Sequence, residues 1–471
     1  MESRVEKVNK DFQDRTDVER GLQQVAGGAP HEAQLMEEYG REQAEYLRAS
    51  RKRETTEDYE PLKILGQGAF GVVRLVRRRA DGAVLALKQM PKKLMQNKNQ
   101  RNRVLAERSA LSSLDNAPGV VSLYSTFQDG DNLYLAMEYL PGGDFMSHLI
   151  RLDILTEDVT RFYIAELVQA VDEVHKRGYV HRDIKPDNIV LDRYGHLKLL
   201  DFGLCTVDPL AGATDSQKEK HNEKLQRGEL QTPRHAKPGA PPVTPGRDGA
   251  ADGPAKPQHP GRALLKSSVG TPQYMAPEVF RRSGYTASAD LWSVGIILFE
   301  CLYGGVPFSD PSNNPYTVGH KVVNWHKFLR LPHPSRPQVS GEAVSLMKGL
   351  LCEPEKRLSA DAIRGHPFFK GLRWEKLKDM RPPIAPKLDA PGESGSASAR
   401  KKGADLNLPQ AGGSSNLRKD LDFVGYTYQR EAEQKKPTVE KVVGSSGSTG
   451  APPVTPKGSA APPQQQQRGR H

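Results

Sequence analysis

The glycines between residues 66 and 71 constrain the fold more than any other feature of this sequence. Gly66-Gln67-Gly68-Ala69-Phe70-Gly71 is followed by Val72-Val73 and has the form GxGxxGxV. The same pattern occurs at dinucleotide sites, but there a helix directly follows the glycines. Here short β-branched runs follow instead, and Asp81-Gly82 separates two of them, which indicates a hairpin. A glycine loop within a hairpin lets backbone N–H groups close over phosphates, although a plain glycine turn reads the same way.

The order of strand-like and helix-like runs predicts the fold class. Short apolar runs with strand character fill residues 62–90, whereas longer helix-like runs cover 162–176, 288–304 and 342–351. Strands first and helices afterwards favour an α+β fold with a small β-sheet lobe and a larger helical lobe.

Glycine and proline are concentrated in two segments. The 471 residues include 43 glycines and 36 prolines, and about half of these lie in residues 208–262 and 371–471. The rest of the chain has ordinary usage. We therefore expect one internal and one terminal linker-like segment around a globular core.

The net charge and the number of cysteines limit the compartment in which the protein is expected, but they do not specify its function. The formal net charge is +11, which permits nucleic acid, anionic membranes or acidic partners and specifies none of them. Three cysteines, Cys205, Cys301 and Cys352, are too few for a disulfide framework, so we expect a reducing compartment. The charged first residues predict no signal peptide, and Glu300 interrupts the most apolar stretch, which favours a buried helix over a membrane span.

Four further motifs follow the glycine loop in a fixed order. They are Leu85-Ala86-Leu87-Lys88, the run HRDIKPDN from His181 to Asn188, Asp201-Phe202-Gly203, and Ala276-Pro277-Glu278. Any one alone is uninformative, since a single strand lysine is normally an exposed edge residue. Together with the glycine loop they match the signature set of protein kinases, so the chain resembles a protein kinase.

The resemblance implies a role for each matched residue. Asp183 would accept or orient the proton of a substrate hydroxyl, and Lys185 would stabilise charge on the γ-phosphate. Lys88 would contact the α- and β-phosphates of ATP, and Glu107, on the helix-like run that follows, would fix its position. The implied ligands of Mg²⁺ are Asn188 and Asp201.

The same resemblance outlines a nucleotide pocket and three structural positions. Met137 precedes the expected hinge and would form the apolar back of the adenine site. The ATP-binding residues implied are Gly66, Gln67, Gly68, Ala69, Phe70, Gly71, Val73, Ala86, Lys88, Met137, Glu138 and Leu140. We expect Glu278 and Arg357 to form a fold-holding ion pair, and Asp290 to anchor the helical lobe rather than to act in catalysis.

Longer stretches narrow the resemblance. YLPGGDFMSHL, GHLKLLDFGLCT, SSVGTPQYMAPEVF and VVNWHKFL are similar to the NDR/LATS group of AGC-class serine/threonine protein kinases, over about residues 37–430. The resemblance implies a two-lobed kinase that phosphorylates Ser/Thr of protein substrates in growth, morphogenesis or cell-division signalling. The expected parts are a helical extension (1–58), a kinase domain (59–370, with lobes 59–140 and 141–370), an AGC-type tail (371–430) and a disordered low-complexity tail (431–471).

Three features of this group concern regulation. The group has a long insert in the activation segment, and the 78 residues from Asp201 to Glu278 here contain the Pro/Gly-rich segment 208–262. Its basic residues are scattered, which disfavours the autoinhibitory basic stretch of the family. Ser267 matches the activation-segment phosphosite. Residues 423–428 match the hydrophobic motif, with Thr427 as a phosphosite for an upstream kinase and with aromatic rings expected to dock beside the helix carrying Glu107.

Partners follow from the same resemblance. Leu35, Tyr39, Ala44 and Leu47 recur at near-helical spacing in residues 1–58, which are otherwise charged. The segment reads either as a solvated helix or as the group's binding site for a Mob-type coactivator. Asp144 is a candidate for reading a basic residue before the phosphate acceptor.

Alternatives from other classes remain open at this point. A catalytically silent scaffold for Mob proteins would leave the catalytic residues without a use, and nucleic-acid binding rests only on the net charge. Thr232, Thr244 and Thr455 each precede a proline, and we interpret them as ordinary linker residues. The expected location is the cytoplasm, with the nucleus as a second location.

Overall fold

The computed structural model divides the chain into two compact units, Met1–Arg53 with Arg430–His471, and Glu54–Gln429. The residues that the structure describes are 2–26, 29–51, 53–68, 71–95, 98–208, 271–281, 286–312, 314–331, 339–386, 406–409, 423, 426–430, 438–439 and 442–443. The insert 208–262 lies almost entirely outside them, as do Ser267, Thr232, Thr244 and Thr455. The boundary between the units falls at residue 53, five residues before the boundary expected from the sequence.

The first unit is built on two helices, α1 (Glu2–Val25) and α2 (Ala29–Arg51). Leu35 and Tyr39 are buried, together with Leu22 of α1. Val442 belongs to the same cluster and has no exposed surface. Val442, in the segment 431–471 that the sequence predicts to be a disordered tail, is thus packed in this cluster, and most of that segment lies outside the described residues.

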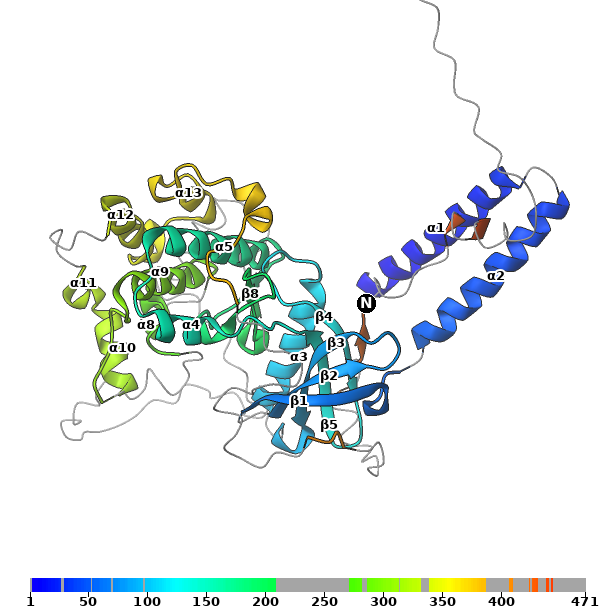
Figure 1. The fold of residues 1–471 in the computed structure, drawn as a ribbon, viewed down its shortest axis with the longest axis horizontal. Helices are drawn as coiled ribbons and strands as arrows, with labels where there is room; N and C mark the ends of the chain where they lie inside the picture. The colour runs from blue at the N-terminus through cyan, green and yellow to red at the C-terminus, as the bar shows by residue number, and fades with distance from the viewer. Residues whose placement is uncertain are drawn as a thin grey trace, which may run out of the picture. The chain divides into compact units, whose positions relative to one another are not determined.

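An antiparallel sheet forms the small lobe of the second unit (Figure 1). Its strands are β1 (Tyr59–Gly68), β2 (Gly71–Arg78), β3 (Val84–Pro91), β4 (Leu123–Gln128), β5 (Asn132–Glu138) and β10 (Tyr428–Gln429), in the order β1-β2-β3-β5-β4-β10. The predicted hairpin at Asp81-Gly82 is confirmed, since β2 pairs with β3 and Gly82 adopts a φ of 74°. Helix α3 (Lys98–Ser113) carries Glu107 beside this sheet.

The large lobe is helical, as the sequence predicts. Its helices are α4 (Phe145–Leu152), α5 (Glu157–Lys176), α8 (Pro277–Arg281), α9 (Ser288–Tyr303), α10 (Pro315–Val323), α11 (Trp325–Phe328), α12 (Gly341–Leu350) and α13 (Ala360–Arg364). Two small sheets, β6 (Tyr179–Val180) with β9 (Thr206–Val207) and β7 (Ile189–Leu191) with β8 (Leu197–Leu199), hold the loops that face the small lobe. The α+β, two-lobed prediction is confirmed.

Local sequence explains the central helices of this lobe. Thr156 caps the start of α5, Glu157 and Asp158 follow in its first turn, and Lys176 lies in its last, each matching the helix dipole. Helix α9 is buried along nearly its whole length, as predicted for the apolar stretch around Leu291. No helix among the described residues combines the length and apolarity that crossing a membrane requires.

Candidate active site

The glycine loop connects β1 to β2, where Gly68 faces Gly71 across the hairpin. A side chain is impossible at Gly71, because its φ is +152° and a Cβ would lie 1.9 Å from the carbonyl oxygen of Gln89. A Cβ at Gly66 or Gly68 would meet no atom of the described residues within 4 Å. Ala69 and Phe70 lie outside the described residues.

Lys88 and Glu107 form the predicted ion pair. Lys88 lies on β3 opposite Val73 of β2, and its Nζ is 2.6 Å from Oε1 of Glu107. Burial disfavours the charge on Lys88, but the carboxylates of Glu107 and Asp201 outweigh burial and raise the pKa of the lysine. Lys88 is therefore held in its charged form, on the strand that pairs with β2.

The nucleotide residues predicted on β3 and β5 lie together. Ala86 pairs with Met137 across the two strands, and both side chains are buried. Glu138 ends β5, and its carboxylate lies 3.4 Å from Nζ of Lys198, so its side chain is already engaged within the protein. Leu140 follows it and packs against the main core. These positions form an apolar wall with backbone groups at its edge, which suits a flat aromatic base.

Three residues converge on the carboxylate of Asp183. Asn188 donates through Nδ2 to Oδ2 of Asp183 (3.0 Å), and Nζ of Lys185 is also 3.0 Å from that oxygen. The backbone N–H of Thr271 donates to the other oxygen (3.1 Å), and Lys185 donates to the Thr271 hydroxyl (2.8 Å). The sequence analysis missed Thr271; the signal was its place in the run Val269–Pro272 before Ala276-Pro277-Glu278.

Asp201 stands at a strained position next to this group. Its φ of 57° is left-handed, and Oδ1 accepts a hydrogen bond from Gly203 N (3.2 Å). Burial disfavours its charge, but Lys88 and the Gly203 N–H outweigh burial and hold the pKa of Asp201 below its ordinary value. Phe202 is fully buried against the ring of His181, which fixes the turn.

Asn188 and Asp201 fit a divalent cation that also binds phosphate. The amide nitrogen of Asn188 is committed to Asp183, which directs its amide oxygen elsewhere. The described residues contain no cluster of three or more His, Cys, Asp or Glu that could hold a metal unaided. One carboxylate and one amide oxygen are typical of sites where substrate phosphates complete the coordination.

Asp290 anchors the loop that carries Asp183. Its carboxylate is fully buried and accepts hydrogen bonds from the backbone N–H groups of His181 and Arg182 (both 2.9 Å) and from Nε2 of His175 (2.8 Å). Arg182 adopts a left-handed φ of 73°. Burial opposes ionisation of Asp290, but these bonds outweigh it and hold its pKa below the ordinary value.

The second predicted structural contact is also present. Arg357 forms a two-pronged ion pair with Glu278, at 2.6 and 3.1 Å, and both side chains are almost completely buried. Arg357 additionally donates to the carbonyl of Ser288 at the start of α9. The pair thus joins α8 to the main helical core.

Asp144 has a local structural use that the sequence analysis did not assign. It is the N-cap of α4, and it accepts from the N–H (2.7 Å) and the hydroxyl (2.8 Å) of Ser147. A more buried acidic group is Glu300, which accepts from the hydroxyl of Tyr274 (2.8 Å). Burial raises the pKa of Glu300, and the nearby charge of Asp187 adds to this effect. Asp187 and Glu300 therefore form a second pair of neighbouring acidic side chains, separate from Asp144.

The tail returns to the small lobe. Leu406 and Pro409 accept hydrogen bonds from Arg74 and Thr56, and Phe423 and Tyr426 are buried. Arg108 of α3 donates to the carbonyls of Tyr426 and Thr427 (both 3.2 Å).

The neighbouring residue of α3 is Glu107, so the predicted docking place is confirmed for Tyr426, whereas the ring of Phe423 lies beside Lys92. The side chain of Thr427 is exposed. Residues 428 and 429 continue as β10 and pair with Ser125 and Thr126 of β4.

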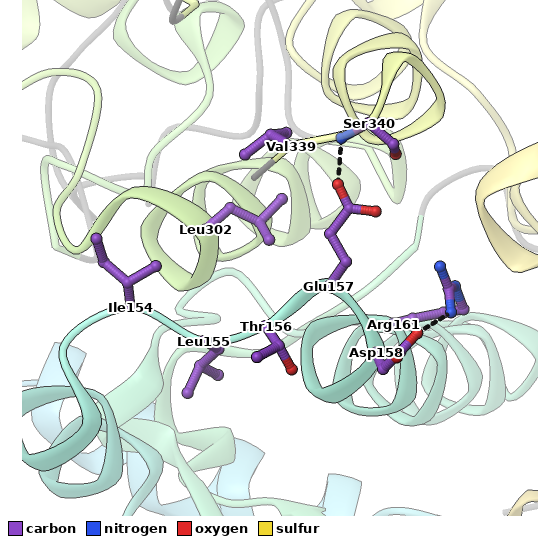
Figure 2. Close-up of a pocket in the computed structure, with 9 residues that line it drawn as sticks. All are labelled: Ile154, Leu155, Thr156, Glu157, Asp158, Arg161, Leu302, Val339 and Ser340. Carbon is purple, nitrogen blue, oxygen red and sulfur yellow. Dashed lines mark hydrogen bonds and ion pairs between the residues drawn. The ribbon is translucent and has the colours of Figure 1, made fainter. Parts of the chain in front are cut away.

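A separate cavity of about 680 Å³ opens on the helical lobe. It is lined by Ile154, Leu155, Thr156, Glu157, Asp158, Arg161, Leu302, Val339 and Ser340 (Figure 2). Glu157 accepts from the N–H of Ser340, and Arg161 pairs with Asp158, so the polar groups at its mouth are paired with one another. None of the predicted site residues lines it.

Comparison with known proteins agrees with this geometry. Residues 59–218 and 252–369 match the family model described as the protein kinase domain. The chain is 40% identical over 408 residues to the serine/threonine-protein kinase CBK1 of Yarrowia lipolytica, covering 84% of this chain and 67% of the relative.

Two further relatives come from other organisms. The probable serine/threonine-protein kinase ndrB of Dictyostelium discoideum is 39% identical, over 83% of this chain and 72% of its own length. The serine/threonine-protein kinase cot-1 of Neurospora crassa is 39% identical, over 83% and 67%. For the CBK1 of Candida albicans the chain spans 56% of the relative's length.

Proposed function

The chain belongs to the protein kinase family, among the serine/threonine kinases of the NDR/LATS group, and we propose that it transfers the γ-phosphate of Mg²⁺-bound ATP to serine and threonine residues of protein substrates. Kinases of this family use ATP with a divalent cation. The oxygen atoms that Asn188 and Asp201 can offer as ligands support Mg²⁺ as that cation. The observation that carries the proposal is the convergence of Asn188, Lys185 and Thr271 on Asp183.

The residues of this chain then divide the work. Lys88, held by Glu107, neutralises charge on the nucleotide phosphates, and the glycine loop covers them with N–H groups. Asp183 orients the substrate hydroxyl and accepts its proton, while Lys185 compensates the negative charge next to it. Thr271 keeps the carboxylate of Asp183 in one orientation. When bound, the cation would be held by Asn188 and Asp201 and would neutralise phosphate charge.

An oriented peptide phosphorylation assay tests the proposal. Removing a general base costs about 10²–10⁴-fold in rate, so Asp183→Asn should lose activity by that factor. A surface change such as Asp361→Asn, at a side chain that is 93% exposed, serves as the matched control. Equal activity of Asp183→Asn and the parent would overturn the assignment and would favour a scaffold.

Recognition of basic residues before the acceptor is the finer part of the proposal. The acidic side chains of Asp144, Asp187 and Glu300 support it, although Asp144 must then serve two purposes. In the same assay, replacing arginines before the acceptor by alanine should raise KM severalfold. An unchanged KM would remove this part and leave phosphoryl transfer untouched.

We propose further that phosphorylation and a coactivator control activity. Docking of Phe423 and Tyr426 beside α3 favours the arrangement in which Glu107 reaches Lys88. Burial of two such rings contributes about 3–6 kcal/mol before ordering costs. Shifting an equilibrium from 1:99 to 99:1 takes about 5.5 kcal/mol. Ring burial alone therefore only just suffices to favour the active arrangement. Phosphate at Ser267 and Thr427, and a Mob-type protein bound to residues 1–58, would each stabilise that arrangement further.

Separate measurements test these points. The parent and Thr427→Ala would both be treated with an upstream kinase. The variant should then have a lower catalytic rate than the parent, and an equal rate would refute the role of Thr427. A Mob protein should be retained by the full chain and lost from a chain lacking residues 1–53; equal retention would refute the binding site. Imaging of the full chain tests the proposed location in the cytoplasm and nucleus.

A further inference from the structure

Residues that follow the hydrophobic motif complete the core of the N-terminal unit. Leu22 of α1, Leu35 of α2 and Val442 have no exposed surface, and Tyr39 is 4% exposed. Val439 and Val443 pack against the same cluster. Two helices alone bury only the stripe where they touch, so full burial of both leucines depends on a third element.

The third element is a single helical turn. The N–H of Val442 donates to the carbonyl of Thr438 (3.0 Å), the bond of one α-helical turn. Val439, Val442 and Val443 therefore share one face, at spacings of three and four residues. That face is the one buried against α1 and α2.

Gly21 of α1 has no side chain, and this allows Val439 to approach the helix closely. A Cβ at Gly21 would lie 2.8 Å from Cγ2 of Val439, closer than real side-chain contacts allow. Glycine weakens a helix interior, so its presence here is explained by the close approach of the valine. Gly40 of α2 provides the contrast, because a Cβ there would meet no atom within 4 Å.

We propose that Val439, Val442 and Val443 form an intramolecular clasp that docks on α1 and α2 and fastens the chain beyond the hydrophobic motif to the N-terminal extension. Residues 430–437 connect β10 to the clasp along the chain, so docking of the clasp shortens the free length of chain beyond β10. The clasp thus deepens the proposed regulation by the hydrophobic motif, and it rests on that proposal for its effect on activity. Any coactivator that binds α1 and α2 at Leu22 and Leu35 must either contact Val442 as well or displace it.

Disulfide trapping tests the docking directly. A Cβ at Gly21 would lie 3.9 Å from Cβ of Val439, inside the window of about 3.5–4.5 Å that a disulfide requires. The full chain carrying Gly21→Cys and Val439→Cys should form this bond within one chain under mild oxidation, as shown by peptide mapping. The matched control carries Gly40→Cys and Val439→Cys and should stay reduced. Of the native cysteines, Cys205 and Cys301 are buried and Cys352 is half-buried, and all three are common to both variants.

Three outcomes would overturn the clasp. They are no bond in the first variant, equal bond formation in the control, and a bond found only between two chains, which would assign the turn to a second copy. The readout requires no phosphoryl transfer. Its failure therefore leaves the proposed function standing, and an inactive protein would still give the bond.

Hydrogen exchange measures the consequence for the tail. Val442→Ser should speed exchange of α1 and α2 amides at least tenfold in the full chain, and it should also speed exchange of the β10 amides. Val25→Ser is the matched control, because Val25 is 52% exposed on α1. Unchanged α1 and α2 exchange would refute the clasp, and unchanged β10 exchange would refute its link to the hydrophobic motif.

Discussion

The carboxylate of Asp290 offers the most direct test of how the helical lobe holds the catalytic loop. We consider Asp290→Asn, which preserves shape but removes the charge and replaces one acceptor oxygen by an NH₂ group. In the parent protein the carboxylate accepts from the backbone N–H groups of His181 and Arg182 and from the ring of His175.

The magnitude follows from these three bonds. A hydrogen bond to a charged acceptor contributes about 1.5–3 kcal/mol and one to a neutral acceptor about 0.5–1.5 kcal/mol, so neutralisation costs about 3 kcal/mol in total. The amide NH₂ also leaves one N–H donor without an acceptor, at about 1–3 kcal/mol more. The left-handed backbone of Arg182 itself costs about 1–3 kcal/mol and persists only while Asp290 enforces it.

The loop should therefore relax in the variant and shift Asp183. Since about 1.4 kcal/mol corresponds to a tenfold change in rate, loss of about 3 kcal/mol of positioning predicts a fall in kcat of about 10²-fold. Peptide phosphorylation kinetics and urea unfolding would be measured side by side, with Asp361→Asn at a 93% exposed site as the control. A variant with kcat within threefold of the parent and an unchanged urea midpoint would refute the reasoning.

Three other predictions use different parts of the molecule. Arg357→Met should lower the free energy of unfolding by about 3–5 kcal/mol, because it leaves the buried charge of Glu278 without a partner. In urea titrations, the double variant with Glu278→Leu should recover part of this loss. An equal loss in both variants would contradict the prediction. Tyr426→Ala should weaken tail docking by about 3–5 kcal/mol, which would appear as faster hydrogen exchange of the β10 amides. Tyr428→Ala, which removes a half-buried ring, should have a smaller effect. Equal effects of the two changes would argue against burial as the cause. The hydrogen bond to Glu166 raises the pKa of His196, so its contribution is fully present below about pH 6.5 and is lost as pH rises through the raised pKa. The stability gap between the parent and His196→Asn should therefore be larger at pH 6 than at pH 9, and a constant gap would count against the pair.

Local motifs made the catalytic residues predictable from the sequence. Phosphoryl transfer needs particular donors at particular spacings, and the run from His181 to Asn188 contains most of them within one loop. The pairing of Lys88 with Glu107 was also predictable, because a strand lysine and a helix glutamate in that order have a specific joint use. What the motifs could not give was the set of bonds made across long stretches of chain, such as those from Asp290 to a loop more than a hundred residues earlier.

Two local signals were present in the sequence and went unread. Asp144 directly precedes the helical run beginning at Phe145, which is the signature of an N-cap, but its expected role in substrate reading obscured this. Val439, Val442 and Val443 have helical spacing, but the Gly/Ser/Pro-rich composition around them hid a turn with only three apolar residues. Segment-wide composition averages away a contact this short.

Strand β10 has a consequence for solubility as well as for control. Without it, β4 would be the outer strand of the sheet, and its unpaired N–H and C=O groups would face the surroundings. Exposed strand edges of this kind recruit strands from other chains. Release of the tail therefore exposes this edge of the sheet, and proteolytic removal of residues after 422 should increase self-association as the protein concentration rises.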